Sequence, residues 1–236
     1  MNYWIIISIA IGVYVIGQGI FSGYLFDKAR NLSKVSYAGQ TEYGNSTSEL
    51  RVLLAGDSIA TGVGSTSFET SLPGRLVNEL SKTHRVIFTN VAKSGNKMSN
   101  LINVSFPEEK QNLMIIFIAS NDLLHFTSLN KFEQHTKSVL DKYSKISDKV
   151  ILIGPADVGG ATAVPLLLKP IYAVRWSKYA SVMKDISASH PNVQYINPID
   201  YKEKLKEYDG AEAKDGFHPN DNGHKYWADI ILSTVT

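Results

Sequence analysis

From residue 50 to the C-terminus, short apolar runs alternate with segments whose apolar residues recur every three or four positions. The apolar runs predict buried strands at 52–55, 86–91, 113–119, 150–153 and 193–196. The intervening segments predict helices at 73–82, 132–143, 171–189 and 220–233. Alternation of this kind predicts an α/β domain built on a mostly parallel, five-stranded sheet with helices on both faces.

The N-terminus has a different pattern, because residues 2–26 contain no charged side chain. A helix needs about 20 apolar residues to cross a bilayer, and Trp4 and Tyr24 stand near the ends of this stretch, where aromatic side chains favour the membrane interface. We therefore predict one transmembrane helix that anchors the chain to a membrane through residues 1–30.

A cleaved signal peptide is the alternative for the same stretch. No Lys or Arg precedes the apolar run and no Ala-x-Ala site follows it, so we favour a retained anchor. Small residues at Gly17, Gly19 and Ser22 leave cleavage open. Lys28 and Arg30 follow the span, and the positive-inside rule would then place the domain in the cytoplasm. A single short segment makes that rule weak, so the side of the membrane stays open.

Residues 31–49 are rich in Ser, Thr, Asn, Gly and Gln, which predicts a flexible polar linker before a globular domain at 50–236. The net charge of +2, with no long basic run, gives no indication of nucleic-acid binding. The chain contains no cysteine. This excludes disulfides, thiolate metal sites, a cysteine nucleophile and a lipid-modified cysteine.

The first predicted strand runs directly into Gly56-Asp57-Ser58. Gly56 permits backbone geometry that a side chain would hinder, and Asp57 and Ser58 favour a turn or a helix N-cap. Taken alone, such a serine is more often a turn or capping residue than a nucleophile. Residues at the ends of the other predicted strands are needed to distinguish a turn-forming serine from a nucleophile.

In parallel sheets, sites lie beyond the carboxyl ends of the strands. Gly95 follows the second predicted strand and Asn121 the third, while Asp215 and His218 precede the last helix. Together they contain the parts of an acyl-transfer site. Ser58 would be the nucleophile, His218 its base and Asp215 the carboxylate that orients the imidazole. The Gly95 N–H, the Asn121 amide and the Ser58 N–H would stabilise the oxyanion.

These four blocks in this order resemble the SGNH (GDSL-type) hydrolase family, whose Ser, Gly, Asn and His correspond to Ser58, Gly95, Asn121 and His218. The resemblance covers about residues 50–234. It implies a flavodoxin-like three-layer α/β/α fold and an esterase or lipase that works through an acyl-enzyme without metal or cofactor. One position departs from the family pattern, because Ala119 stands where a glycine is usual. This change affects the expected geometry of the oxyanion hole and leaves the triad intact.

Other polar residues have simpler interpretations. Asp57 and Asp122 are expected to shape their turns through local hydrogen bonds. His224 lies close in sequence to Asp215 and Asp221, but the spacing lacks the compact pattern of a zinc site. We therefore predict that no metal is bound.

The long connection at residues 157–170 contains Val164-Pro165-Leu166-Leu167-Leu168. It could line an acyl pocket, touch lipid or pack against the core, and a filled pocket would favour acetyl groups over lipids. We predict an esterase that removes a small acyl group, most simply acetyl, from a carbohydrate or cell-envelope ester. The alternatives are a lysophospholipase or thioesterase, and a weakly active carbohydrate-binding or acyl-transfer accessory protein. The expected partners are a small-molecule, glycan or lipid ester and the membrane.

Overall fold

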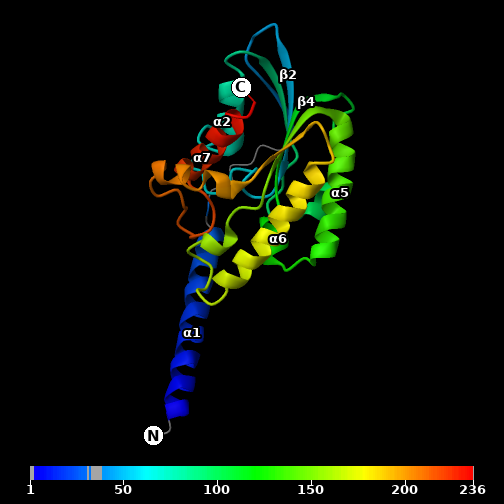
Figure 1. Ribbon diagram of the computed structural model, residues 1–236. Coiled ribbons are helices and arrows are strands. Elements are labelled where there is room, and N and C mark those ends of the chain that lie inside the picture. The colour runs from blue at the N-terminus through cyan, green and yellow to red at the C-terminus, as the bar shows by residue number, and fades with distance from the viewer. Residues whose placement is uncertain (1–2, 31, 33–38, 236) are drawn as a thin grey trace.

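The computed structural model describes residues 3–30, 32 and 39–235 (Figure 1). A central sheet carries helices on both faces, and a long N-terminal helix, α1 (Tyr3–Arg30), projects from one end of the domain. The strands of the sheet are β1 (Gly39–Tyr43), β2 (Glu49–Gly56), β3 (Arg85–Asn90), β4 (Gln111–Phe117), β5 (Ser147–Ile153) and β6 (Val193–Ile196).

The sheet has six strands in the order β1-β3-β2-β4-β5-β6. β2 pairs in parallel with β3 and β4, β5 pairs in parallel with β4 and β6, and β1 pairs antiparallel with β3. The sheet is therefore mixed. Its parallel strands bring their carboxyl ends to one edge, where connections to helices cluster.

The prediction of a five-stranded parallel sheet is wrong by one strand, because β1 forms inside the stretch 31–49 that the sequence assigns to a linker. β1 consists largely of polar residues such as Gln40, Thr41 and Glu42, and it lies at the edge of the sheet with little burial. Backbone hydrogen bonds to β3 hold it, so it needs no apolar alternation that a sequence pattern could reveal. Residues 33–38 of the predicted linker lie outside the described residues.

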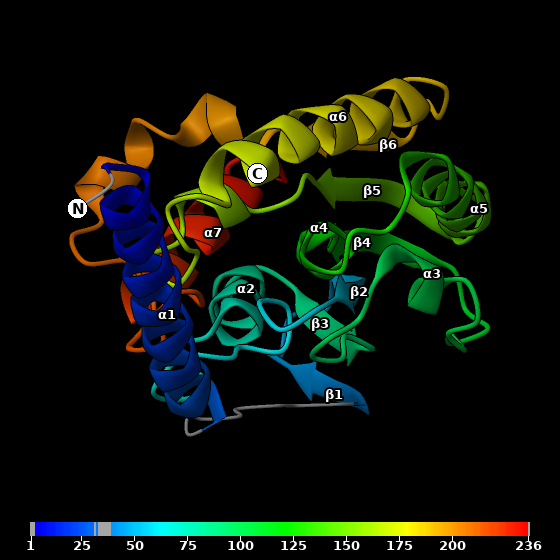
Figure 2. The ribbon, with the colours of Figure 1, turned by 90° about the horizontal axis from the view of Figure 1, so that it is seen from below.

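The principal helices are α2 (Leu72–Leu80), α3 (Met98–Leu101), α4 (Ser120–Leu124), α5 (Leu129–Ile146), α6 (Lys169–Ser187) and α7 (Asp221–Leu232). Three short 3-10 helices accompany them, at Val158–Gly160, Pro198–Tyr201 and Lys204–Glu207. Figure 2 shows α2 and α7 on one face of the sheet and α3 and α5 on the other, with α6 packed beside α5. Apart from short α3 and α4, each helix agrees with a segment expected from the apolar pattern.

Two apolar cores result, one on each face of the sheet. β4 shows how the sequence builds both, because Leu113, Ile115 and Phe117 face the core under α2 and α7, whereas Met114 and Ile116 face the core under α5 and α6. A strand that is apolar at every position is expected when both faces are covered. The domain is thereby a layered α/β structure.

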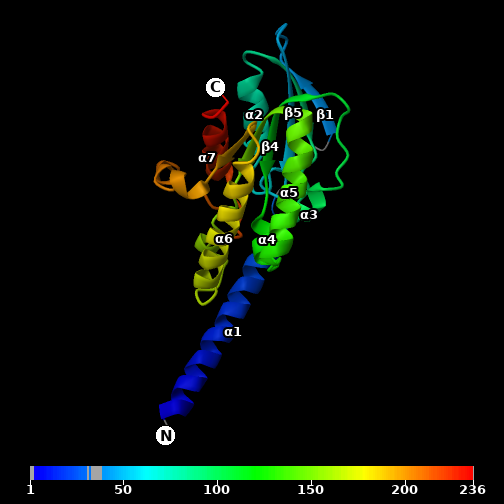
Figure 3. The ribbon, with the colours of Figure 1, turned by 45° about the vertical axis from the view of Figure 1, so that its right-hand side comes forward.

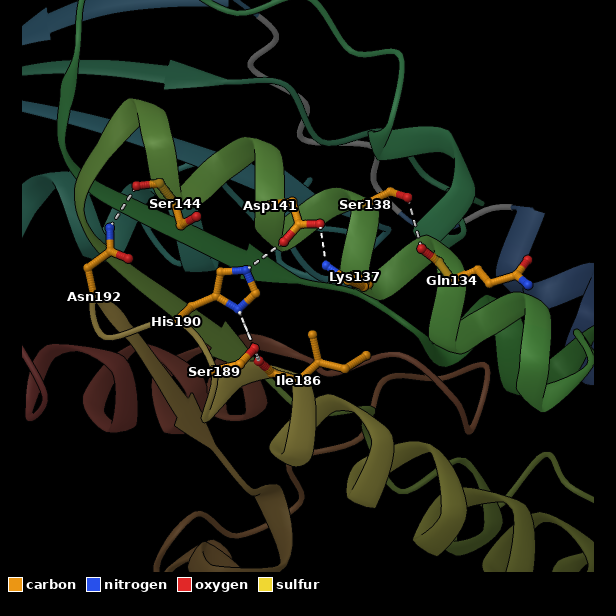
Figure 4. Close-up of polar contacts among 9 residues, drawn as sticks. All are labelled: Gln134, Lys137, Ser138, Asp141, Ser144, Ile186, Ser189, His190 and Asn192. Carbon is orange, nitrogen blue, oxygen red and sulfur yellow. Dashed lines mark hydrogen bonds and ion pairs between the residues drawn. The ribbon is translucent and has the colours of Figure 1, made fainter.

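Polar contacts fasten α5 to the connection between α6 and β6 (Figure 4). His190 Nε2 lies 3.0 Å from Asp141 Oδ1, and the Asn192 amide donates to the carbonyls of Ser144 and Ser147 at 2.8 and 2.9 Å. Ser144 lies near the end of α5 and Ser147 begins β5, so these contacts stand at the amino end of the parallel strands. These contacts stabilise the packing of α5 at the end of the sheet that lies away from Ser58, Gly95 and Asn121, which follow the carboxyl ends of the strands.

α1 differs from the other helices because it projects away from the domain (Figure 3), and the large apolar side chains described for it between Tyr3 and Tyr24 are mostly exposed. Within the described part of the chain, the stretch Tyr3–Phe21 is long and apolar enough to cross a membrane. A membrane anchor and a signal sequence both have this length and composition.

Candidate active site

The turn after β2 is shaped by a close approach of backbone. A Cβ atom on Gly56 would lie 2.2 Å from the carbonyl oxygen of Phe117 on β4 and 2.8 Å from the Cβ of Ala60. The following residue, Asp57, donates its N–H to that same carbonyl at 3.1 Å. Only glycine fits at position 56, as the sequence predicts, and the chain can then turn sharply to present Ser58 at the end of the sheet.

Asp57 is fully buried beneath this turn, and its Oδ1 accepts the N–H of Ile59 at 3.1 Å. This is the local turn-forming role that the sequence predicts. Burial raises the pKa of Asp57 to about 7, although the Ile59 N–H and the nearby His218 both act to lower it. Through its hydrogen bond with the Ile59 N–H, the buried Asp57 carboxyl stabilises the turn that presents Ser58.

We expect the free energy of unfolding of the Asp57→Asn variant, taken relative to that of the wild type, to increase as the pH rises from about 4 to about 7. The pKa of Asp57 in the folded protein, about 7, exceeds the ordinary aspartate value of 3.8, so the stability contributed by protonation is complete at low pH and is lost as the pH rises through this window. Asparagine does not titrate. The difference in free energy of unfolding should change by roughly 1.4 kcal/mol per pH unit. Urea unfolding at about pH 5 and about pH 8 measures this, and a pH-independent difference would contradict it.

The structure brings Ser58, His218 and Asp215 into one hydrogen-bonded line. His218 Nε2 lies 3.0 Å from Ser58 Oγ, and His218 Nδ1 lies 2.5 Å from Asp215 Oδ2. With the proton assigned to Nδ1, the imidazole donates to the carboxylate and accepts from the serine hydroxyl. This is the arrangement in which a histidine can remove the proton of a serine.

Asp215 is held in its loop by the backbone, because its Oδ1 accepts the N–H groups of Phe217 and His218 at 3.1 and 3.0 Å. Burial by itself would raise the pKa of Asp215. The hydrogen bond and charge of His218 and the two backbone donors outweigh burial and keep the pKa below its ordinary value. Asp215 is thus a carboxylate at neutral pH, with one oxygen reserved for the imidazole.

Gly64 allows the loop that carries His218 to approach the serine turn. Its φ is +99°, and a Cβ atom there would lie 2.1 Å from the carbonyl oxygen of Pro219. Gly64 therefore helps to set the distance between Ser58 and His218. The sequence does not single out this glycine, because the need for it arises from a neighbour more than a hundred residues away.

Hydrogen bonds made by Asn96, the residue after Gly95, connect Gly95 and Asn121 to the turn that carries Ser58. The Asn96 amide donates to the carbonyl of Gly56 at 3.2 Å, and the Asn121 amide donates to the carbonyl of Asn96 at 3.1 Å. An amide nitrogen carries two hydrogens, so Asn121 retains a second donor. Within the described part of the chain, the backbone N–H groups of Ser58 and Gly95 donate to no protein acceptor. The segments that carry the expected oxyanion donors are therefore connected through Asn96, and each donor has an N–H that no protein acceptor in the described part of the chain occupies.

Ala119 adopts the left-handed backbone conformation, with φ of 101°, just before Asn121. This explains why glycine suits the position, since a side chain at such a φ introduces strain. The loop keeps the conformation despite the methyl group.

Asp122, which follows Asn121, accepts the N–H of Met98 at 2.8 Å. It thereby fastens α3 rather than only its own turn, and burial raises its pKa.

His224 lies in the core. It is fully buried, with Nδ1 accepting the N–H of Leu72 at 3.2 Å and Nε2 lying 3.0 Å from the carbonyl of Val63. Burial lowers its pKa to about 4, so it is neutral at physiological pH. Both ring nitrogens are engaged with backbone groups. Among the residues that the structure describes, no group of three or more His, Asp or Glu side chains is arranged to hold a metal ion.

Two cavities of very different size adjoin His218, and they also share Ile59, Ala156, Asp157, Ala161 and Phe217 in their linings. The small cavity, of about 30 Å³, includes Ser58, Ser120, Val158 and Ala161 in its lining. The large cavity, of about 520 Å³, is lined by His218 but not by Ser58. Its aromatic lining is Trp176, Tyr208, Phe217, Tyr226 and Trp227, and its charged lining is Asp157, Lys202 and Glu212.

The connection at 157–170 combines two of the outcomes that the sequence leaves open. Val158, Ala161 and Val164 are buried against the core, and the first two also line the small cavity. Leu166 and Leu167 instead point outward, with exposed fractions of 63% and 61%. The first part of the connection fills the space beside Ser58, whereas the second part forms an apolar surface.

Comparison with known proteins places this site in context. The model of the GDSL-like Lipase/Acylhydrolase family matches residues 54–226. No match was found among the curated proteins.

Similar solved structures include a catalytic mutant of Axe2, an acetylxylan esterase from Geobacillus stearothermophilus, with 21% identity and a TM-score of 0.61 over 80% of this chain and 94% of that one. TesA is similar with 20% identity and a TM-score of 0.62, over 79% and 98% of the two chains. LAE5, an alpha/beta hydrolase enzyme from the metagenome of Lake Arreo, Spain, has 18% identity and a TM-score of 0.61, over 81% and 95%. At these identities the likeness concerns the fold.

Proposed function

The chain belongs to the GDSL-like lipase/acylhydrolase family and is an ester-bond hydrolase, and from this premise we propose that it removes a short acyl group, such as acetyl, from a carbohydrate or cell-envelope ester. The observation that carries this proposal is the contrast between the two cavities, with about 30 Å³ in the one lined by Ser58 and about 520 Å³ in the one lined by His218 without Ser58.

The chemistry assigns one role to each residue. Ser58 Oγ attacks the ester carbonyl while His218 Nε2 takes its proton, and Asp215 stabilises the imidazolium that forms. The N–H groups of Ser58 and Gly95 and the Asn121 amide donate to the oxyanion. When the intermediate collapses, His218 returns the proton to the leaving alcohol. A water molecule then repeats the sequence on the acyl-enzyme, releasing the acid and restoring Ser58.

Proton transfer decides which cavity holds which part of the substrate. The leaving alcohol oxygen has to lie next to His218 Nε2, and the large cavity is lined by His218 but not by Ser58, so we assign the alcohol portion to the large cavity. A sugar ring has apolar C–H faces and polar hydroxyl edges. Aromatic side chains such as Trp176 and Tyr208, together with Asp157 and Glu212, offer surfaces of both kinds.

The acyl group is then left with the small cavity. A cavity needs roughly 10 to 15 Å³ to hold one water molecule, so about 30 Å³ admits an acetyl methyl group and excludes a long chain. Val158 and Ala161 line it together with Ser58, and both are buried in the core. Short acyl chains are therefore favoured over lipid chains.

A series of p-nitrophenyl esters tests the assignment with the detergent-solubilised full chain. We expect kcat/KM to fall by about ten-fold or more from acetate to butyrate, and further for octanoate, because each added methylene exceeds the small cavity. Val158→Ala enlarges this cavity and should raise the ratio of butyrate to acetate activity.

Equal or faster hydrolysis of octanoate would contradict the acetyl assignment and favour a lysophospholipase or thioesterase, with the acyl chain in the large cavity. Absence of hydrolysis for every ester would favour the accessory binding or acyl-transfer role. A second comparison uses an acetylated oligosaccharide, which the large cavity should bind better than it binds p-nitrophenyl acetate.

We also propose that α1 anchors the domain to a membrane. The support is its exposed apolar surface and the length of the stretch Tyr3–Phe21. Flotation of the full chain with lipid vesicles tests this, and recovery of the protein with the soluble fraction would contradict it.

A further inference from the structure

The exposed apolar side chains of the domain gather at one end. Among the described residues outside α1, the large apolar side chains that are exposed are Phe126, Leu129, Leu166, Leu167, Leu168, Ile171, Val174, Ile199 and Leu205. They belong to the turn between α4 and α5, to the connection and first turns of α6, and to the short helices after β6. All these segments follow the carboxyl ends of parallel strands, or begin the helices that lead away from them.

Six of these residues form a surface that we name the leucine patch: Phe126, Leu166, Leu167, Leu168, Ile171 and Val174. Phe126 joins it from a separate segment, because its ring lies 5.6 Å from the ring of Tyr172, and the Arg175 guanidinium lies 4.8 Å from its centre. Arg175 also donates to the carbonyl of Thr127 at 2.8 Å. The α4–α5 turn is thereby fixed against the start of α6.

Phe126 is an unusual residue at its position. It has a φ of 52° and an exposed fraction of 51%. Asparagine or glycine accepts this backbone conformation more easily, and contacts with Tyr172 and Arg175 cover only part of the ring. The fold therefore holds a large apolar side chain in a strained turn while leaving half of it in water. A surface that covers the ring from outside the domain would account for this.

The direction of α1 indicates what covers the patch. Figures 1 and 3 show that α1 leaves the domain at the end where α6 begins and where the α4–α5 turn lies. A bilayer that holds α1 would therefore lie on the same side of the domain as the leucine patch and would face it. We propose that the leucine patch docks on the lipid surface of that bilayer, so that the catalytic end of the domain faces the membrane.

This inference rests on the proposed role of α1 as a membrane anchor. The tether favours lipid over a second copy of the chain or a soluble partner, because it holds the patch near the bilayer at a high effective concentration. The basic side chains among the patch residues are engaged within the domain, because Arg175 donates to the carbonyl of Thr127 and Lys169 to the carbonyl of Ala161, so the exposed apolar side chains provide the contact with lipid. Leu166, Leu167 and Leu168 line neither cavity, so docking would leave both cavities free to receive esters presented at the membrane.

The absence of cysteine allows a direct test with single labels. Leu167→Cys carries an environment-sensitive fluorophore in the patch. Lys82→Cys, exposed just after α2 and before β3 at the opposite end of the sheet, is the matched control. The full chain is placed in vesicles of phosphatidylcholine and phosphatidylglycerol, with and without a nitroxide-labelled lipid. We expect the label at 167 to shift to the blue and to be quenched several-fold more than the label at 82. Apolar docking should persist in about 1 M salt.

Phe126→Ser combined with Leu168→Ser, introduced into the Leu167→Cys chain, should reduce the quenching to less than about half while hydrolysis of p-nitrophenyl acetate stays unchanged. Vesicle flotation with an unquenched label at 167 would overturn docking and leave the anchor standing. Failure to float would overturn both. A blue shift without nitroxide quenching that grows with the protein-to-lipid ratio would assign the patch to a second copy. Ester hydrolysis by the unsubstituted chain is measured in a separate assay. Absence of hydrolysis in that assay would contradict the proposed function and would leave the docking proposal unaffected.

Discussion

Replacement of Ser58 by alanine is expected to lower kcat/KM for p-nitrophenyl acetate by at least about 10³-fold. Ser58 Oγ is the atom that His218 Nε2 faces at 3.0 Å, and alanine removes the atom that forms the acyl-enzyme. The remaining oxyanion donors and the two cavities would still bind the ester. The loss should therefore fall mainly on kcat, with little change in KM.

Ser65→Ala provides a matched control, because Ser65 is also a buried serine of the turn after β2 and its hydroxyl donates to the carbonyl of Gly62 at 2.7 Å. It should lose some stability and keep its activity per folded molecule. A fluorophosphonate probe should label Ser58 in the wild type and leave the Ser58→Ala chain unlabelled. Equal rates for wild type and Ser58→Ala would show that another residue is the nucleophile.

Asp215→Asn is expected to reduce kcat by about 10³- to 10⁴-fold with little loss of structure. The Asp215 carboxylate accepts from His218 Nδ1 at 2.5 Å and holds the tautomer in which Nε2 can accept the serine proton. An asparagine that presents its NH2 group to Nδ1 favours the opposite tautomer, in which Nε2 carries the proton and cannot act as a base. Its carbonyl oxygen can still accept the N–H groups of Phe217 and His218, so the loop should persist.

Asp221→Asn is the matched control for Asp215→Asn. Asp221 lies in the first turn of α7, and its carboxylate accepts from the N–H and the hydroxyl of Thr66 at 2.8 and 2.6 Å. Its substitution should affect stability more than kcat. Kinetics with p-nitrophenyl acetate and thermal unfolding separate the two effects. If the two aspartate variants lost activity to the same extent, orientation of His218 by Asp215 would not be the cause.

Much of the fold is predictable from local sequence. Continuous apolar runs such as residues 113–119 identify strands that are covered on both faces, and segments with helical periodicity identify the helices between them. The limit is visible at β1, whose polar residues Gln40, Thr41 and Glu42 form an edge strand through backbone hydrogen bonds. Backbone pairing of this kind requires no particular side chain, so no apolar pattern predicts it.

The candidate site is predictable to a similar degree. Ser58, Gly95, Asn121, Asp215 and His218 can each be identified because each follows a strand or precedes a helix with turn-forming neighbours. The need for Gly64 cannot be identified in this way, since it depends on the carbonyl of Pro219 packing 2.1 Å from the position of a missing Cβ atom. Contacts between distant segments have no signature in either segment alone.

By itself, therefore, the sequence determined the layered α/β class, the apolar N-terminal helix and the residues of a candidate acyl-transfer site, because periodicity and turn chemistry act over short windows. Only the tertiary structure decided the edge strand, the line from Ser58 through His218 to Asp215, the unequal cavities beside them and the leucine patch. Each of these depends on side chains that segments far apart in the chain bring together, and a cavity or a surface is defined by what its neighbours leave open.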